Sequence, residues 1–204
     1  AMKDTEVVPH IIIGDCDSIK TEVLNYYKDK GVNLIVRKDS TTTDFEKCLY
    51  IALEKVSDMQ NEFDIDYEPD FNLVIVGASG GRIDHTFNIY RLSCKYSDKF
   101  KELIKANFIL IGESSLSVIL NTKSENVLDC SGLQKGLGYS LMSLSGQADV
   151  TIEERAGTNK EKLNVKISHS NYFFRKSTLP DSISIVFGKI SGHSDKAFLI
   201  NFVI

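Results

Sequence analysis

Residues 71–85 read FNLVIVGASGGRIDH, and this stretch decides the fold of the 204-residue chain. Its first six residues form an apolar run typical of a buried strand, and a glycine-rich turn follows at once. From about Asp84 the pattern predicts a helix. A strand that passes through a glycine-rich turn into a helix is the repeating unit of a parallel α/β sheet.

The residues upstream repeat this alternation of strand and helix. We expect strands over 10–13, 32–36, 71–76 and 106–111, helices over 20–30 and 43–56, and a surface loop over 57–70. Thr43 is the expected N-cap of the second helix. In parallel sheets ligands bind at the carboxyl ends of the strands, so the polar residues that follow each strand should share one edge.

The pattern changes after Gly112, where short β-rich pieces follow one another without a helical period. These pieces lie at 116–120, 126–128, 139–144, 163–167, 182–187 and 197–204. Six strands at this spacing predict a small antiparallel sandwich. We therefore expect an α/β fold class, with an N-terminal parallel-sheet α/β domain over residues 1–112 followed by an all-β sandwich domain over residues 113–204.

The composition excludes several classes of protein. The chain has 24 Lys and Arg against 28 Asp and Glu, a formal charge of -4, and 42% hydrophobic residues. This balance argues against disorder and against a basic surface for nucleic acid. No apolar stretch approaches the ~18 residues that a membrane span needs. We expect neither nucleic acid nor membrane as a partner.

The four cysteines show no metal or redox motif. They stand far apart, with no C-x-x-C pair, at Cys16, Cys48, Cys94 and Cys130. With no recognisable signal peptide, we expect reduced thiols, mostly in the core, and a cytoplasmic location.

Carboxylates follow the first two predicted strands. Asp15 and Asp17 flank Cys16 directly after the first strand, and Asp44 follows the second. Carboxylates that meet at one edge repel one another unless a cation joins them, and Mg²⁺ bridging carboxylates to substrate phosphates is the usual solution. An Asp-x-Asp pair after a strand is also common as a turn and helix cap, which is the simpler interpretation of each motif alone.

The turn after the third strand has the composition of a phosphate site. Gly80 and Gly81 would let main-chain N–H groups approach phosphate oxygens, and Arg82, followed by Asp84, would add a planar cationic fork. A Gly-Gly pair alone is often only a turn. The chain contains no G-x-x-x-x-G-K-[ST] loop, which excludes P-loop chemistry. Taken together, the three motifs predict a Mg-nucleotide site.

In order and spacing these motifs resemble those of the thiamin pyrophosphokinases. Residues 14–18 (GDCDS), 43–47 (TDFEK) and 77–85 (GASGGRIDH) are similar to the G-D-x-D-S, T-D-x-x-K and G-G-x-x-G-G-R-x-D motifs of that family, with Ala78 in place of the second glycine. The resemblance implies an α/β nucleotide-binding catalytic domain followed by a β-sandwich that binds thiamine and dimerises. It implies transfer of diphosphate from ATP, as co-substrate, to the hydroxyl of thiamine, giving thiamine diphosphate and AMP. It also implies a homodimer with the active site at the subunit interface.

The resemblance assigns roles residue by residue. It implies that Asp15, Asp17 and Asp44 hold Mg²⁺ and the ATP phosphates, and that Arg82 and Asp84 orient the diphosphate. Either Asp44 or Asp84 could accept the hydroxyl proton. The further binding residues that it implies are Ser18, Thr43, Lys47, Gly80, Gly81, Ser168, Ser170 and Asn171. The last three belong to a Ser-Asn segment that would contribute to the thiamine site, beside which we expect Tyr172 or Phe173 to stack on the substrate.

The chain departs from the family pattern in two places. Family members usually begin with a strand that ends in Asp-Gly-Gly, so we expect either a sequence that starts after this strand or a protein that has lost it. The family's Gly-Leu-Lys-aromatic-Leu stretch is not matched by residues 153–158, and the chain has no Trp.

Two alternative functions stay open at this point. One is a metal-dependent nucleotide-sugar glycosyltransferase, in which an Asp-x-Asp motif also binds a metal diphosphate. The other is a non-catalytic thiamine-binding or nucleotide-binding protein.

Overall fold

The computed structural model describes residues 7–62, 71–103, 106–133, 138–167, 173–191 and 197–203. Within these ranges the chain has a mixed α/β fold in which most elements are strands. The chain divides into two compact units, Ala1–Tyr67 and Glu68–Ile204. No helix in the described ranges has the length and apolar character needed to cross a membrane.

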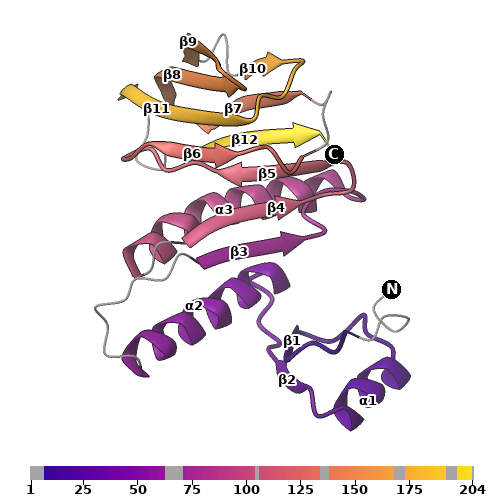
Figure 1. The fold of residues 1–204 in the computed structure, drawn as a ribbon. Coiled ribbons are helices and arrows are strands. Elements are labelled where there is room, and N and C mark those ends of the chain that lie inside the picture. The colour runs from indigo at the N-terminus through magenta and orange to yellow at the C-terminus, as the bar shows by residue number, and fades with distance from the viewer. Residues whose placement is uncertain are drawn as a thin grey trace. The chain divides into compact units, whose positions relative to one another are not determined.

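The first unit contains a pair of parallel strands with two helices. Its elements are β1 (Ile11–Gly14), α1 (Thr21–Asp29), β2 (Asn33–Val36) and α2 (Asp44–Glu62). The strands pair in register, with Ile12 opposite Leu34, and α1 and α2 lie on opposite sides of the pair (Figure 1). Gly31 allows the turn into β2 because its φ of 76° lies in the left-handed region. The strands and helices expected here are confirmed.

Helix α2 is longer than the sequence pattern predicts. We expected a loop from residue 57, but the helix continues to Glu62. Residues 57–62 include Met59 and Gln60, which favour a helix, and contain no glycine or proline that would end one. The polarity of this segment therefore did not indicate a loop.

The second unit begins with another strand, helix and strand. These are β3 (Phe71–Val76), α3 (Ile83–Leu103) and β4 (Ala106–Ile111), and the two strands are parallel. Helix α3 buries Leu92, Tyr96 and Phe100, which follow one another at four-residue steps on one face. The ring of Phe100 meets that of Phe108 on β4 edge to face, with 5.3 Å between their centroids. This contact fixes α3 against the sheet.

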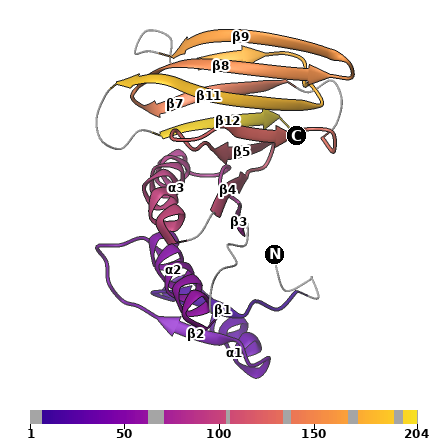
Figure 2. The same cartoon turned by 60° about the vertical axis from the view of Figure 1, so that its left-hand side comes forward.

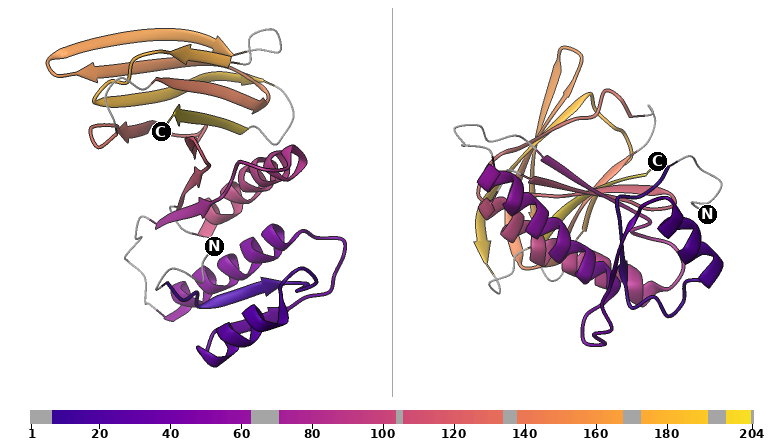
Figure 3. Two further views of the ribbon diagram at one scale, coloured as in Figure 1. Left: turned by 90° about the vertical axis from the view of Figure 1, so that its right-hand side faces the viewer. Right: turned by 90° about the horizontal axis from the view of Figure 1, so that it is seen from below.

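The remaining strands form a sandwich. They are β5 (Ser115–Ile119), β6 (Asn126–Asp129), β7 (Tyr139–Ser145), β8 (Gln147–Ala156), β9 (Asn159–Ile167), β10 (Phe173–Lys176), β11 (Ser182–Ser191) and β12 (Ala197–Val203). One sheet has the order β10-β7-β12-β5-β4-β3 and the other β6-β11-β8-β9. Figures 2 and 3 show the strands of the two sheets as facing layers. The core between them takes Leu141 and Phe198 from the first sheet and Ile152 and Ile185 from the second.

The parallel strands do not form one sheet in this structure. Strands β1 and β2 make a sheet of two, whereas β3 and β4 continue through β5 into the six-stranded sheet. Strands β4 and β5 are antiparallel neighbours on either side of Gly112, where the sequence places the boundary between residues 1–112 and 113–204. The division into a parallel α/β domain and a sandwich domain stays a prediction.

The sequence analysis missed strands β8 and β10. Strand β8 does alternate, because Ala148, Val150, Ile152 and Glu154 are buried and the residues between them are more exposed. The pattern was hidden by the charged end of the strand, where Glu154 occupies an inward position that normally holds an apolar side chain.

Glu154 is buried because two partners compensate its charge. Its Oε1 accepts a hydrogen bond from the Tyr139 hydroxyl at 2.5 Å, and its Oε2 pairs with the Lys176 ammonium at 2.5 Å. Lys176 also reaches Glu161 at 2.7 Å. Burial and the hydrogen bond to Glu154 raise the pKa of Tyr139 above its usual value, so the hydroxyl keeps its proton and acts as the donor. The network joins β7, β8, β9 and β10 at one end of the sandwich.

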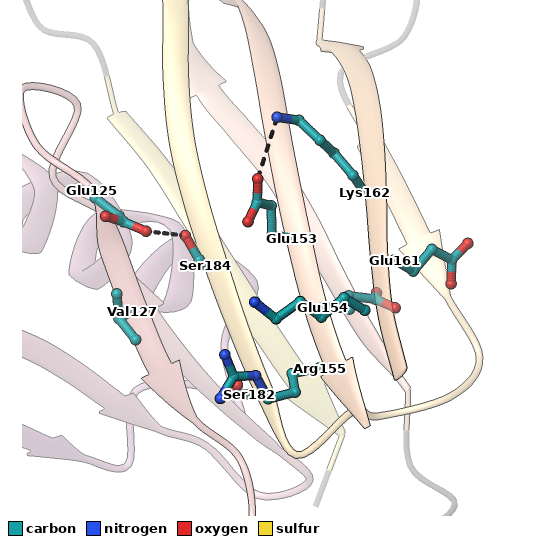
Figure 4. A pocket seen from close by; sticks show the side chains of 10 residues that line it. Glu125, Val127, Glu153, Glu154, Arg155, Glu161, Lys162, Ser182 and Ser184 are labelled. Atoms are coloured by element: carbon teal, nitrogen blue, oxygen red, sulfur yellow. Dashed lines mark hydrogen bonds and ion pairs between the residues drawn. The ribbon is translucent and has the colours of Figure 1, made fainter. Parts of the chain in front are cut away.

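We predict that Lys176→Met destabilises the protein by about 2 kcal/mol, because a carboxylate that is only 7% exposed loses its cation. The matched control is Lys162→Met, since Lys162 pairs with Glu153 on the outer face of the four-stranded sheet that contains Glu154, and the two side chains are 61% and 55% exposed (Figure 4). That change should cost less than about 0.5 kcal/mol. Urea denaturation measures the change in the free energy of unfolding for both variants, provided that the m-value is unchanged. Equal losses in the two variants would contradict the role given to the buried pair.

Candidate functional site

The end of β1 lies against the start of α2 in the first unit. A Cβ atom placed on Gly14 would lie 3.0 Å from Oδ2 of Asp44 and 3.1 Å from its Cγ. Only a residue without a side chain lets this carboxylate approach the strand end so closely. Thr43 caps α2, because its hydroxyl accepts a hydrogen bond from the N–H of Glu46 at 3.3 Å. The structure thus brings the first two predicted motifs together.

A buried lysine neutralises Asp44. The side chain of Lys47 is 4% exposed, and its Nζ lies 2.9 Å from Oδ1 of Asp44. The bond to Asp44 raises the pKa of Lys47 above its usual value, and the charges of Asp15 and Asp39 add to this effect. Lys47 therefore remains charged and balances part of the negative charge in this unit.

Asp15 and Asp17 form a tight turn after β1. The main-chain N–H of Asp17 donates to Oδ1 of Asp15 at 3.1 Å, and Cys16 between them has a φ of 61°. This hydrogen bond is the main reason that the pKa of Asp15 lies below its usual value, and the charge of Lys47 lowers it further. The carboxylate of Asp15 is therefore ionised at neutral pH. Ser18 follows on the exposed side of the turn.

Asp39, whose charge acts on Lys47, is a further acidic residue of this unit that the sequence analysis did not identify. It lies between β2 and α2 and accepts hydrogen bonds from the Thr42 hydroxyl at 2.7 Å and from the N–H of Thr41 at 2.8 Å. These bonds lower its pKa to about 2. Its position after a predicted strand could have revealed it, by the same rule that identified Asp44.

The glycine-rich loop after β3 belongs to the second unit. Gly77, Gly80 and Gly81 have φ values of 78°, 112° and 69°, a region that other residues enter only with strain. Gly80 and Gly81 are exposed, whereas Ala78 between β3 and these glycines is fully buried. The loop therefore has a fixed base and an accessible tip directly before α3.

Arg82 and Asp84 form a two-bond ion pair at the start of α3. Nε of Arg82 donates to Oδ1 of Asp84 at 3.1 Å, and Nη2 donates to Oδ2 at 2.6 Å. This pairing is the main reason that the pKa of Asp84 is lowered and that of Arg82 raised. The two side chains remain 70% and 59% exposed, so the guanidinium keeps a face open to a ligand.

The predicted residues thus form two groups. Asp15, Asp17, Asp44 and Lys47 lie in the first unit, and Gly80, Gly81, Arg82 and Asp84 in the second. The predicted segment Ser168–Asn171 and Tyr172 lie outside the described residues, as does the side chain of Phe173. Among the described residues, no group of three or more His, Cys, Asp or Glu side chains is arranged to hold a metal ion.

All four cysteines are free thiols, as expected. The expectation that most lie in the core is wrong. Only Cys130 is buried, and Cys48 is exposed on α2.

A hollow of about 500 Å³ lies on the sandwich, and none of the residues that line it is a predicted site residue (Figure 4). It is lined mainly by charged side chains, among them Glu125, Glu153, Arg155 and Lys162. Four of the lining residues contact one another. Lys162 forms an ion pair with Glu153 at 3.2 Å, and the Ser184 hydroxyl donates a hydrogen bond to Glu125. Its lining has four glutamates against three basic residues, so the hollow has no excess positive charge suited to a phosphate.

Comparison with known proteins connects these two groups to one family. The family model described as thiamin pyrophosphokinase, catalytic domain, matches residues 1–104, which is half of the chain. The chain belongs to the thiamin pyrophosphokinase family. The match includes all five residues for which a catalytic role was predicted, and residues in both units.

Curated relatives of the family match only part of the chain. Thiamine pyrophosphokinase 1 of Oryza sativa subsp. japonica is 32% identical over 90 residues, which are 42% of this chain and 31% of that protein. Thiamin pyrophosphokinase 1 of Caenorhabditis elegans is 30% identical over 118 residues, 55% of this chain and 44% of that protein. The chain therefore spans less than half the length of these relatives.

Solved thiamin pyrophosphokinase structures share the fold across nearly the whole chain. The protein from Candida albicans aligns with a TM-score of 0.69 and 16% identity, covering 97% of this chain and 74% of that one. The protein from Geobacillus thermodenitrificans aligns with a TM-score of 0.66 and 17% identity, covering 96% and 78%. At such identities the likeness establishes the fold alone.

We predict that Lys47→Met raises the pKa of Asp15, because one of the charges that lowers it is removed. The control is Lys55→Met on the same helix. Lys55 pairs with Asp58 at 3.4 Å, and both side chains are exposed. It should leave the pKa of Asp15 unchanged. Titration of the side-chain carboxyl carbons by NMR measures both. An Asp15 pKa that does not move in Lys47→Met would show that Lys47 lies too far away to act on it.

Proposed function

We propose that this protein is a thiamine diphosphokinase, which transfers diphosphate from ATP to the hydroxyl of thiamine and releases AMP. The observation that carries the proposal is the family match over residues 1–104, which contains every predicted catalytic residue. The relatives named above bear the name of this activity. The geometry of the two groups supplies the supporting chemistry.

The glycine-rich loop is suited to bind the phosphates of ATP. Its exposed tip at Gly80 and Gly81 precedes α3, a helix of 21 residues whose first N–H groups favour a negative charge. Arg82 adds a guanidinium whose contact with Asp84 fixes its plane, and a fixed guanidinium can bind two phosphate oxygens at once. Together these groups would orient the diphosphate that is transferred.

The first group is suited to hold Mg²⁺. Asp15, Asp17 and Asp44 offer only carboxylate oxygens, the ligands that Mg²⁺ prefers, and Gly14 leaves the space that Asp44 occupies beside the strand end. Mg²⁺ commonly uses one or two carboxylates and completes its shell with substrate phosphates and water. A cage of three protein ligands is therefore not needed. When bound, the ion would neutralise charge on the phosphate oxygens.

The protein's own residues would act mainly by positioning. The thiamine hydroxyl would attack the β-phosphorus while Arg82 binds the oxygens on which charge increases, and AMP would leave on the opposite side. Of the two candidate proton acceptors we favour Asp44. Arg82 engages both oxygens of Asp84, whereas Lys47 binds Oδ1 of Asp44 and leaves Oδ2 facing Gly14. Ser18, Thr43 and Lys47 would support this side of the site.

We further propose the two-domain arrangement and the dimer that the family resemblance implies. The parallel α/β part would bind the nucleotide, and the sandwich of the partner subunit would bring Ser168, Ser170 and Asn171 to thiamine. The alternatives, a nucleotide-sugar glycosyltransferase or a non-catalytic binding protein, are not favoured because the matched family is a diphosphotransferase family. A cytoplasmic location, without nucleic acid or membrane as a partner, remains a prediction from the sequence.

We predict that Asp17→Asn lowers the rate of AMP formation from ATP and thiamine by ~10²-fold or more. The fold should persist, because the main-chain N–H of Asp17 that bonds Asp15 is kept and the side chain is exposed. Asp58→Asn, an exposed change on α2, is the control and should keep the parent rate. An Asp17→Asn enzyme with the parent rate and the parent dependence on Mg²⁺ would remove Asp17 from the site.

The dimer makes a separate prediction. Asp17→Asn and Asn171→Ala should each be inactive alone, but a mixture that exchanges subunits should regain part of the activity, since one of its two sites then carries neither change. Light scattering should give the mass of a dimer. A monomer with full activity would exclude a shared site.

A further inference from the structure

The turn between β4 and β5 lies directly against the base of the glycine-rich loop. The N–H groups of Gly77 and Ala78 both donate to the carbonyl of Ile111, at 2.9 Å and 3.0 Å. Gly112 comes next, and its N–H donates to the carbonyl of Ser115 at 2.8 Å. The base of the loop is therefore fixed to the last residue of β4, beside a turn that has its own hydrogen bond.

Gly112 has no space for a side chain. A Cβ atom at this position would lie 1.8 Å from Oγ of Ser79 and 3.0 Å from its Cβ, and 3.1 Å from Oγ of Ser115. Real Cβ atoms do not approach another heavy atom to 1.8 Å, so any side chain at residue 112 must displace Ser79. Rotation of the serine would remove the contact with Oγ, but the close contact with its Cβ would persist.

The backbone of Gly112 does not itself require glycine. Positive φ values occur at Gly77, Gly80 and Gly81, whereas Gly112 is not among the described glycines with positive φ. An alanine could adopt the same backbone without strain. The need for glycine at this position comes from its side-chain neighbours, chiefly Ser79 and to a lesser degree Oγ of Ser115.

We infer that Gly112 is a positioning residue for nucleotide binding: by leaving space for Ser79, it sets the place of the Gly80 and Gly81 amides that would meet the ATP phosphates. This role rests on the proposed function. Ser79 lies between the anchored half of the loop and its exposed glycines, so its displacement moves the tip while Gly77 and Ala78 stay bonded to Ile111. The β4–β5 turn thus determines the position of the tip of the glycine-rich loop.

The first test compares Gly112→Ala with Gly132→Ala. Gly132 also lacks a positive φ, and a Cβ atom there meets nothing within 4 Å, so it controls for the chemical change alone. We expect Gly112→Ala to weaken the binding of ATP, measured by calorimetry, about tenfold. Its KM for ATP should rise by the same factor while the KM for thiamine stays near the parent value. Gly132→Ala should match the parent in each measurement.

The second test removes the group with which alanine collides. Introduced into a Ser79→Gly background, Gly112→Ala should cause little further loss of ATP affinity, because neither Oγ nor Cβ of residue 79 remains and the hydroxyl of Ser115, at 3.1 Å, can rotate away. In a Ser79→Ala background the loss should be intermediate, because a Cβ at 3.0 Å is still too close. A merely structural role for Gly112 would not give this graded rescue.

Hydrogen exchange of the peptide over residues 77–82 distinguishes two questions. The first is whether Gly112 sets the conformation of the loop, and the second is whether the loop binds ATP. Faster exchange in Gly112→Ala, together with weaker ATP binding, supports the positioning role. Unchanged exchange and unchanged ATP affinity overturn it, whatever the enzyme does. Faster exchange with unchanged ATP affinity means that the loop does not bind phosphate, which overturns both this inference and the proposed nucleotide site.

Loss of folding in Gly112→Ala would also give a clear answer. If the double variant Ser79→Gly with Gly112→Ala then folds with the melting temperature of Ser79→Gly alone, the contact with Ser79 is confirmed. If the double variant fails to fold as well, Gly112 has another role and the inference is wrong.

Discussion

Strand β4 is paired on both edges, and the second unit depends on this double pairing. It forms parallel hydrogen bonds with β3 on one side and antiparallel bonds with β5 on the other. The parallel pair requires a crossover through α3, and the antiparallel pair allows a short turn. The glycine-rich loop and the β4–β5 turn therefore emerge at the same end of neighbouring strands. The contacts of Ile111 and Gly112 with the loop follow from this arrangement.

In each unit a lysine pairs with a carboxylate, and one partner of each pair is buried. Lys47 pairs with Asp44 beside a strand end, and Lys176 pairs with Glu154 at one end of the sandwich. In each case the lysine is close to more than one carboxylate, and a half-exposed or exposed acid completes the group. The difference lies in which partner is buried. Asp44 is 52% exposed and remains available to a ligand, whereas Glu154 is 7% exposed and serves the fold.

Much of the fold could be predicted from the sequence because its signals are local. The apolar runs before Gly14 and Gly77 predicted β1 and β3, the apolar residues at three- and four-residue steps after Thr43 predicted α2, and the glycine-rich turn after β3 marked the start of α3. Strand β8 could not be predicted in this way, because Glu154 interrupts its inward positions and its partners Tyr139 and Lys176 are distant in the chain. The assignment of β3 and β4 to the six-stranded sheet depends on pairing between segments far apart, which no local pattern encodes.

In the candidate site, too, features with a local sequence signal could be predicted, whereas those that depend on side-chain contacts could not. Strand ends and glycines led to the prediction of which residues carry the chemistry, from Asp15 to Asp84, and this assignment stays a prediction. The sequence did not show that Lys47 is buried against Asp44 or that Arg82 engages both oxygens of Asp84, since such contacts depend on side-chain geometry. Glu113 was missed although it follows β4, and its Oε2 lies 3.6 Å from where a Cβ of Gly80 would be. The strand-end rule, extended to the fourth strand, would have found it.

The place of β12 in the sheet has a consequence for how the chain folds during synthesis. Residues 197–203 pair with β5 on one side and β7 on the other, at the centre of the six-stranded sheet. Until these residues have left the ribosome, β5 and β7 have no strand between them, and the apolar faces of both remain without their final neighbour. Contacts between segments so far apart in the chain form slowly. Chaperones that bind exposed apolar strands would therefore have their longest opportunity on the nascent sandwich, before its central strand is made.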